Sequence, residues 1–353
     1  MSAPGEPPPR GEFARIGTLL AGLPRGEGVV VGPGDDAAVL RPRDDRDLVV
    51  TTDTFVERRH FRRDLLEAAE AGGRFAAANL SDIAAMAALP RWATMSLVVP
   101  ADWSEDAARA FEHACAETLA ADGAAVVGGN LASTEGAFSA TLTLVGEVER
   151  GLAWTRAGAR AGDVLAVTGV PGSAAAFLAL ALSNDPPSRA RVPDALIKRF
   201  LRPGSRVGLA RALAAAGGVR AAIDVSDGLS GDLAHVCLAS GVGACIDAAK
   251  LPADEPLLAA TRRLSAGEGD ERGALPAAEL ALRTNLQLGP SDDYELLLAI
   301  EPGAWPRCAT IAEAQGVKLT AFGEFETAPG LRLRGHDGSV RPLMARGWDH
   351  FAS

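Results

Sequence analysis

The stretch ERGLAWTRAGARAGDVLAVTG, residues 149–169, decides how the chain divides. Its second part, VLAVTG at 164–169, is an apolar, β-branched run that predicts a strand. A Gly-Ser pair then opens an alanine-rich helix near 173–183. Because a strand and a helix restart after a connecting segment, a new α/β unit begins here. We therefore predict two domains, residues 1–150 and residues 151–353.

The segments on either side of this connection alternate between strands and helices. In the first half we predict strands at DLVVTTDTF (47–55), ATMSLVV (93–99), AAVVGG (124–129) and FSATLTLVGEV (138–148), with helices near 63–70, 73–88 and 104–121. In the second half we predict helices near 192–200, 204–216 and 229–240, strands near 243–249, 294–300, 317–323 and 330–334, and an exposed loop at 265–276. This alternation predicts the α/β class.

Composition excludes several classes of partner. A chain of 353 residues with 48% apolar content is long enough for two packed cores. Its 35 basic and 45 acidic residues give a net charge of −10, so we expect neither nucleic acid nor an anionic membrane surface as a partner. An anionic substrate would need local help from metal ions or helix N-termini.

The cysteine pattern and the N-terminus indicate where the protein works. The four cysteines, Cys115, Cys237, Cys245 and Cys308, show no CxxC spacing and lie in apolar contexts, which favours reduced structural thiols. The first residues, MSAPGEPPPRGEF, lack the apolar core of a signal peptide, and no stretch is apolar enough to span a membrane. We expect a cytoplasmic protein.

Acidic residues gather at the junctions between predicted strands and helices. They are Asp35, Asp36, Asp53, Asp82, Asp224, Asp227, Asp292, Asp293 and Glu295. An ionised carboxylate beside buried apolar segments needs a cation or a shifted pKa. The three lysines, Lys198, Lys250 and Lys318, lie away from these motifs, so we expect the carboxylates to lack basic partners. Hard oxygen ligands completed by phosphate are what Mg²⁺ requires.

Each motif also has a purely structural interpretation. Asp35 and Asp36 follow a Gly-Pro-Gly turn, where aspartate is common. Ser81 with Asp82, and Ser226 with Asp227, are typical N-caps of helices. The combination favours a functional site, because the acids recur beside glycines and at helix starts whose N–H groups suit a phosphate.

Other nucleotide and nucleophile signatures are absent from the sequence. There is no GxxxxGK[ST] and no protein-kinase motif set, which excludes a P-loop protein and a protein-kinase fold. There is also no HExxH and no GxSxG, so a hydrolase with an activated serine is not expected. Among the histidines, His60 and His350 lie in loop-like contexts where a functional role is plausible.

Nine motifs in order resemble the thiamine-monophosphate kinase family, within the superfamily of aminoimidazole ribonucleotide synthase. They are GEF (11–13), GPGDDAAVL (32–40), TTDTFVERRHF (51–61), ANLSDIAAMAA (78–88), GGN (128–130), TRAGARAGD (155–163), AIDVSDGLSGDL (222–233), DDYELL (292–297) and GWDHF (347–351). The resemblance implies a two-domain fold: an N-terminal domain that binds ATP and Mg²⁺ and whose sheet forms a barrel with that of a second subunit in a homodimer, and a C-terminal α/β domain.

The resemblance also implies roles for individual residues. The implied Mg²⁺ ligands are Asp36, Thr51, Thr52, Asp53, Asp82, Asn130, Asp224 and Asp227. The implied ATP contacts are Gly129, Asn130, Arg156 and Ser226, and the implied contacts to thiamine monophosphate are His60, Asp292 and Trp348. The implied reaction is transfer of the ATP γ-phosphoryl group to thiamine monophosphate. An anionic acceptor needs no general base, so no catalytic acid or base is expected.

Three positions depart from the family pattern. Asn130 stands where the family usually has aspartate, Asp292 where it has glutamate, and Ala87 where it has glycine. Two alternatives therefore stay open. One is a related ATP-using synthase of the same superfamily with another acceptor, which His60 and the GWDHF segment disfavour. The other is a nucleotide-binding homologue with weakened catalysis, which Asn130 and Asp292 favour.

Overall fold

The computed structural model describes residues 26–32, 37–183, 185–266 and 276–348. Asp36 and His350 lie outside these ranges, as does most of the predicted loop at 265–276. Helices pack against sheets in both halves, which confirms the predicted α/β class. Within the described residues, no helix is long and apolar enough to cross a membrane.

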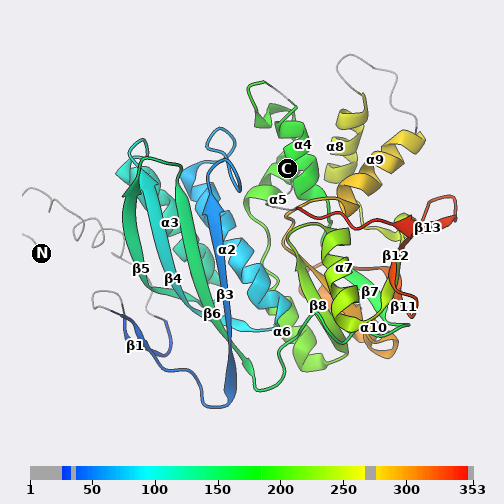
Figure 1. Cartoon of the computed structure of the whole chain (residues 1–353), viewed down its shortest axis with the longest axis horizontal. Coiled ribbons are helices and arrows are strands. Elements are labelled where there is room, and N and C mark those ends of the chain that lie inside the picture. Colours follow the sequence, from blue (N-terminus) through cyan, green and yellow to red (C-terminus); the bar gives the residue numbers. More distant parts are fainter. Residues whose placement is uncertain (1–25, 33–36, 184, 267–275, 349–353) are drawn as a thin grey trace, which may run out of the picture.

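The first half is a four-stranded sheet covered on one face by two helices (Figure 1). Its strand order is β3-β6-β4-β5, and β4 and β5 pair in parallel while the other neighbours are antiparallel. The strands are β3 (Arg46–Val56), β4 (Leu89–Pro100), β5 (Ala125–Thr134) and β6 (Ser139–Glu149). A short pair, β1 (Val29–Val31) and β2 (Val39–Leu40), lies beside this sheet.

Alternation along β3 gives this sheet two different faces. Phe55 is buried beneath the helices, whereas Leu48 and Val50 are 51% and 62% exposed on the other face. Thr52 and Thr54 share that exposed face, because their hydroxyls contact Thr143 and Thr141 of β6 directly across the ladder. We call this side of the sheet the open face; among the described elements, β1 and β2 cover it only around Trp92 and Val145, and leave it uncovered along β3.

The helices of the first half are α2 (Ala68–Ala85) and α3 (Glu105–Ala121). The predicted helices at 63–70 and 73–88 are wrong as two elements, because one helix begins at Ala68, where Glu67 and Glu70 form a capping box. Small residues let the two helices approach closely. A Cβ added at Gly72 of α2 would overlap the carbonyl oxygen of Phe111 in α3, so the helices touch backbone to backbone.

The second half is a seven-stranded sheet with helices on its faces (Figure 1). Its order is β13-β12-β9-β11-β7-β10-β8, and only β9 and β12 pair in parallel among these strands. The strands are β7 (Val164–Thr168), β8 (Val219–Val225), β9 (Gly243–Asp247), β10 (Glu295–Ile300), β11 (Leu319–Glu326), β12 (Gly330–Arg334) and β13 (Val340–Leu343). The longer helices are α4 (Ser173–Ala181), α5 (Asp194–Leu201), α6 (Val207–Ala216), α7 (Leu229–Ser240), α8 (Glu255–Ala266), α9 (Pro276–Leu288) and α10 (Trp305–Ala314).

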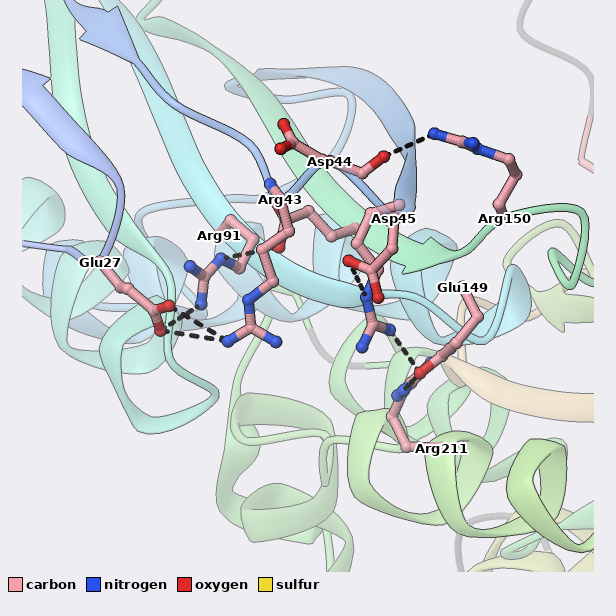
Figure 2. A network of polar contacts seen from close by, with 10 residues as sticks. Glu27, Arg43, Asp44, Asp45, Arg91, Glu149, Arg150 and Arg211 are labelled. Atoms are coloured by element: carbon pink, nitrogen blue, oxygen red, sulfur yellow. Dashed lines mark hydrogen bonds and ion pairs between the residues drawn. The ribbon is translucent and has the colours of Figure 1, made fainter.

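The two halves are joined through α2 and through ion pairs. Helix α2 contacts α5, α6, β8 and β10 of the second half. Arg211 of α6 donates to both carboxylate oxygens of Glu149 at the end of β6, at 2.7 and 2.6 Å, and to the carbonyl of Ala87 at 2.9 Å. Figure 2 shows Arg211 and Glu149 at one end of a polar network that continues through the first half to Arg91 and Glu27.

Candidate active site

A cavity of about 380 Å³ lies between the two halves. It is lined by residues 47–51 of β3, by the end of α2, by Arg156 of the connection and by residues 222–224 of β8. Four of the predicted functional residues border it, namely Thr51, Asp82, Asp224 and Arg156. The sheet edges of both halves therefore meet at one site.

The carboxylates of this site are buried and crowd one another. Burial, followed by the charge of Asp82, raises the pKa of Asp53 to about 6. Burial also raises the pKa of Asp224 well above its ordinary value, and the charges of Asp82, Asp232 and Asp53 add to the effect. A group of like charges that resists ionisation in this way is a site that a cation would stabilise.

The surroundings of Asp82 change its pKa in opposite directions. Burial raises the pKa of Asp82, whereas a hydrogen bond from Thr51 and the charge of Arg156 lower it. The hydroxyl of Thr51 donates to Oδ2 of Asp82 at 2.5 Å and so links β3 to α2. The interpretation of Ser81 and Asp82 as an N-cap is wrong, because Asp82 lies in the last turn of α2.

The donor atoms at this site fit Mg²⁺ by their chemistry, although not, among the described residues, as a single preformed cluster. Within the described ranges, no three histidine, cysteine, aspartate or glutamate side chains are arranged to hold one ion, and Asp36 falls outside those ranges. The chemistry of the donors nevertheless suits the ion, since Asp53, Asp82 and Asp224 offer hard oxygens and interact electrostatically. Buried carboxylates whose pKa values rise for want of a counter-charge fit a divalent cation.

Two predicted ligands face away from this cluster. The side chain of Thr52 lies on the open face, opposite to Thr51 and Asp53. Asn130 lies on β5, in register with Ser96, Thr141 and Thr54 across the sheet, which places it on the open face too, three strands from β3. Within one chain the structure does not bring either side chain to Asp82.

Gly129 is required by the close approach of two strands. A Cβ added at Gly129 would overlap the carbonyl oxygen of Met95 on β4. The same test at Gly128 places the nearest atom, a methyl of Thr94, 3.8 Å away, which is ordinary contact. Glycine at 129 therefore has a packing reason that is independent of any nucleotide.

The start of α7 is organised by an aspartate that the sequence argument missed. The N–H groups of Ser226, Asp227 and Gly228 all donate to Oδ2 of Asp232, at 3.2, 3.3 and 3.0 Å. The N-cap of α7 is Gly228, so the interpretation of Ser226 and Asp227 as side-chain caps is wrong. These three N–H groups are also not free for a phosphate, contrary to the expectation for this helix start.

The C-terminal segment docks against the same turn. The N–H of Trp348 donates to the carbonyl of Asp227 at 2.9 Å, and the N–H of Arg346 donates to Oγ of Ser230 at 3.0 Å. Trp348 is 50% exposed. The chain therefore brings a half-exposed indole beside Asp227, although the two residues are far apart in sequence.

His60 lies in the turn that follows β3. Its ring stacks on Phe55, with centroids 5.4 Å apart and planes inclined by 15°. The N–H of Val56 donates to Nδ1 of His60 at 3.0 Å. A nitrogen that accepts a hydrogen bond is unprotonated, so the neutral ring carries its proton on Nε2.

Asp292 has a basic partner, so the expectation that the carboxylates lack one is wrong for this residue. Arg74 of α2 contacts Oδ2 of Asp292 at 2.6 Å and donates to its carbonyl at 2.8 Å. Burial alone would lower the pKa of Arg74, but the charge of Asp292 raises it above its ordinary value. The signal in the sequence is a lone arginine inside an apolar run, AGGRFAAANL at 71–80.

Tyr294 links Asp292 to the carboxylate cluster. Burial and then the charge of Asp292 raise the pKa of Tyr294, with further contributions from Asp53 and Asp224. Tyr294 is 8% exposed and has a positive φ of 54°. The Tyr294 hydroxyl is thus near enough to the carboxylates of β3, of β8 and of the 290–294 loop to be affected by their charges.

Comparison with known proteins places this site in a class. Residues 34–148 match the N-terminal domain of the AIR synthase related proteins, and residues 160–336 match the C-terminal domain of the same family. Two such domains with a site between them define the chain as an AIR synthase related protein, which confirms the predicted two-domain fold. The division at residue 150 stays a prediction.

Relatives narrow this class further. The thiamine-monophosphate kinase of Escherichia coli K12 is 36% identical over 326 residues, covering 92% of this chain and 93% of that protein. The crystal structure of thiamine-monophosphate kinase from Stenotrophomonas maltophilia K279a superposes with a TM-score of 0.75 and 33% identity, covering 92% of this chain and 94% of that one. This chain belongs to the thiamine-monophosphate kinase family, which confirms the resemblance carried by the nine motifs.

A further solved structure of this group contains ligands. It is described as AaThiL complexed with AMPPCP and TMP, and it superposes with a TM-score of 0.72 and 28% identity, covering 88% of this chain and 89% of that one.

Proposed function

We propose that this chain transfers the γ-phosphoryl group of ATP to the phosphate of thiamine monophosphate, which yields thiamine diphosphate and ADP. The observation that carries the proposal is the buried cluster of Asp53, Asp82 and Asp224 beside a cavity between the two halves. Membership of the family and the complex of a similar structure with AMPPCP and TMP support it.

We further propose that several Mg²⁺ ions share Asp53, Asp82 and Asp224 as ligands around the phosphates, without all three carboxylates on one ion, and that Thr51, Asp36 and Asp227 are additional ligands. When bound, the ions would supply positive charge that neutralises phosphate oxygens and fixes their geometry. The protein side contributes preorganisation: Thr51 holds the carboxylate of Asp82, and Arg156 borders the same cavity with a positive charge suited to ATP. Ser226 and Gly129 remain proposed ATP contacts.

The acceptor contacts follow from the chemistry of three side chains. Trp348 offers a half-exposed indole, which suits a cationic thiazolium ring. His60 offers an Nε2–H that can donate to a phosphate oxygen. Asp292 offers a carboxylate that is 30% exposed and can accept from an amino group. These three residues are proposed to bind thiamine monophosphate.

The test is a coupled assay that measures ADP release from ATP and Mg²⁺ with and without thiamine monophosphate. We expect turnover only when the acceptor is present, and formation of thiamine diphosphate by chromatography. Asp53→Ala and Asp224→Ala are expected to abolish turnover while the circular dichroism spectrum is retained. A folded wild-type protein that turns over neither thiamine monophosphate nor close analogues would overturn the proposal.

A second candidate is a nucleotide-binding homologue with weakened catalysis. It is motivated by Asn130, an amide where the family usually has an anionic ligand. Calorimetric binding of ATP without ADP release would favour this candidate. Activity that appears in Asn130→Asp would then identify the missing charge as its cause.

We also propose a homodimer in a reducing cytoplasm. The open face leaves Leu48 and Val50 more than half exposed, and apolar sheet faces are usually covered. Thr52 and Asn130 lie on this face, so their proposed ligand roles require a second copy over it. All four cysteines are buried free thiols, as suits a reducing compartment.

The dimer can be tested by light scattering, which should give twice the chain mass for the wild type and a smaller mass for Val50→Glu. A wild-type monomer at micromolar concentration would contradict the dimer.

A further inference from the structure

Arg74 is a charged side chain of the first half whose ion pair, hydrogen bonds and ring contacts are made with the second half. It is 1% exposed, although it lies on α2 of the first half. Its guanidinium donates to the carbonyl of Phe200 in α5 and to the carbonyl of Asp292. It lies 3.8 Å from the centroid of the Phe200 ring and 4.9 Å from that of Tyr294. Such a site holds a planar cation in one orientation.

The loop that carries Asp292 is fixed from its own side by other contacts. Asp293 accepts from the N–H groups of Gly172 and Ala174 at the start of α4, at 2.6 and 2.9 Å, and Ser291 donates to Asp293 at 2.7 Å. The N–H of Tyr294 donates to the carbonyl of Val225 at 2.9 Å. Asp292 differs from its neighbours, because its carboxylate is oriented by Arg74 from the first half.

We propose that Arg74 is a positioning residue for recognition of thiamine monophosphate, which holds the carboxylate of Asp292 toward the acceptor. The inference rests on the proposed function. Oδ2 of Asp292 contacts the guanidinium, while Asp292 stays 30% exposed and so keeps part of its carboxylate accessible. A paired carboxylate presents an oriented acceptor for an amino group rather than a mobile charge.

Helix α2 connects this contact to the phosphate end of the site. Arg74 and Asp82 lie eight residues apart on α2, which at 1.5 Å per residue is about 12 Å. Asp82 borders the cavity together with Thr51, and Arg74 orients the carboxylate of Asp292. One rigid helix therefore fixes the spacing between the phosphoryl-transfer end and the end that recognises the acceptor.

The experiment compares Michaelis constants for both substrates in the full-length protein. Arg74→Met is expected to raise the KM for thiamine monophosphate at least tenfold while the KM for ATP changes less than twofold. Asp292→Asn should raise the same KM to a similar extent. The KM of the double variant should not exceed that of the single variant with the higher KM, because the two residues act as one unit. Arg74→Lys keeps the charge but not the planar fork, so its KM should be intermediate.

Arg211→Met is the matched control. It also removes an arginine that joins the two halves, but its partners, Glu149 at the end of β6 and the carbonyl of Ala87 after α2, belong to the first half and not to the 290–294 loop. For Arg211→Met we expect a lower melting temperature than wild type and an unchanged KM for thiamine monophosphate. A purely structural role of Arg74 would make both arginine variants alike.

The outcomes separate this inference from the proposed function. Wild-type protein without turnover of thiamine monophosphate would overturn both. Wild-type turnover with an unchanged KM in Arg74→Met, or with both KM values rising together, would overturn the role of Arg74 alone. If Arg74→Met does not fold, Arg74→Lys and Asp292→Asn decide the matter by the same two constants, and a wild-type KM in both would again overturn it.

Discussion

The hydroxyl of Thr51 donates a hydrogen bond to Oδ2 of Asp82, and this 2.5 Å contact joins the middle of β3 to the last turn of α2. This hydrogen bond and the charge of Arg156 favour the charged form of Asp82, while burial opposes it. The proton affinity of the Asp82 carboxylate therefore depends on a neutral hydroxyl as well as on the charge of Arg156.

Removal of this hydroxyl should weaken the site without disturbing the fold. We expect Thr51→Val to lower kcat/KM by roughly 10- to 100-fold, since a hydrogen bond to a charged group contributes about 1.5–3 kcal/mol. The acid limb of the pH profile should also move to higher pH, because the pKa of Asp82 rises when the donor is lost. Thr51→Ser, which keeps the donor, should stay within a few-fold of wild type. A Thr51→Val protein with wild-type kinetics at every pH would refute this.

Glu112 of α3 should make the protein less stable at neutral pH than at mildly acidic pH. Its side chain is 4% exposed, Nε2 of His113 lies 3.7 Å away, and burial raises the pKa of Glu112 from 4.5 to about 7. Between these two values the unfolded chain loses the proton first, so the free energy of unfolding falls as pH rises through this window. The loss amounts to at most about 3 kcal/mol above pH 7.

The measurement for Glu112 is urea unfolding at pH 5 and pH 8. Glu112→Gln removes the titration and should exceed wild type in stability at pH 8 by about 1–3 kcal/mol, with a much smaller difference at pH 5. Glu117→Gln, an exposed position on the same helix, serves as the control. Equal differences at both pH values would show that Glu112 does not titrate in this range.

Replacement of Ala87 by glycine should make the protein more stable. Its φ is 54°, a left-handed conformation that costs a residue with a Cβ about 1–2 kcal/mol. We expect Ala87→Gly to raise the free energy of unfolding by up to about 1 kcal/mol, because glycine avoids this cost but gains freedom in the unfolded chain. Ala88→Gly, equally buried but without a positive φ, should instead lower it by about 1 kcal/mol. Denaturant titrations of both variants measure these changes. If both variants are destabilised equally, the backbone at Ala87 is not strained.

Gly129 and Gly128 form a matched pair on β5. Gly129→Ala should destabilise the protein by about 2 kcal/mol or more, because the new methyl group would overlap the carbonyl oxygen of Met95. Gly128→Ala meets only a methyl of Thr94 at 3.8 Å and should change stability by less than about 0.5 kcal/mol. Thermal unfolding of both variants without nucleotide separates packing from any effect on ATP binding.

The sequence predicts best where the pattern is local. The strand expected at 47–55 is β3 (Arg46–Val56), since alternation marks a sheet with two different faces. Helices α8, α9 and α10 were not predicted, because the alanine-rich background hides the period of 3.6 residues. The sequence marks residues 222–233 as a motif but predicts no strand at β8, the edge strand that carries Asp224.

The site required long-range information. Asp82, Asp224 and Thr51 come from three elements, and their meeting depends on how α2 packs between the halves. Asn130 was expected beside these acids, but strand order and register place it on the open face. Arg74 and Asp292 are separated by 218 positions, so no local pattern could pair them. The acidic residues can be identified from the sequence because they lie at junctions between strands and helices. The residues that contact them in the structure cannot be identified in this way.

The contact of α2 with α3 at Gly72 limits how the molecule can move. Because the backbones touch there, the two helices cannot slide along each other without collision, which excludes a shear motion within this layer. Any opening or closing of the cavity must then carry α2 and α3 as one body relative to the second half. The distance between Asp82 and Arg74 would stay constant through such a movement, so the two ends of the site would engage or release their ligands together.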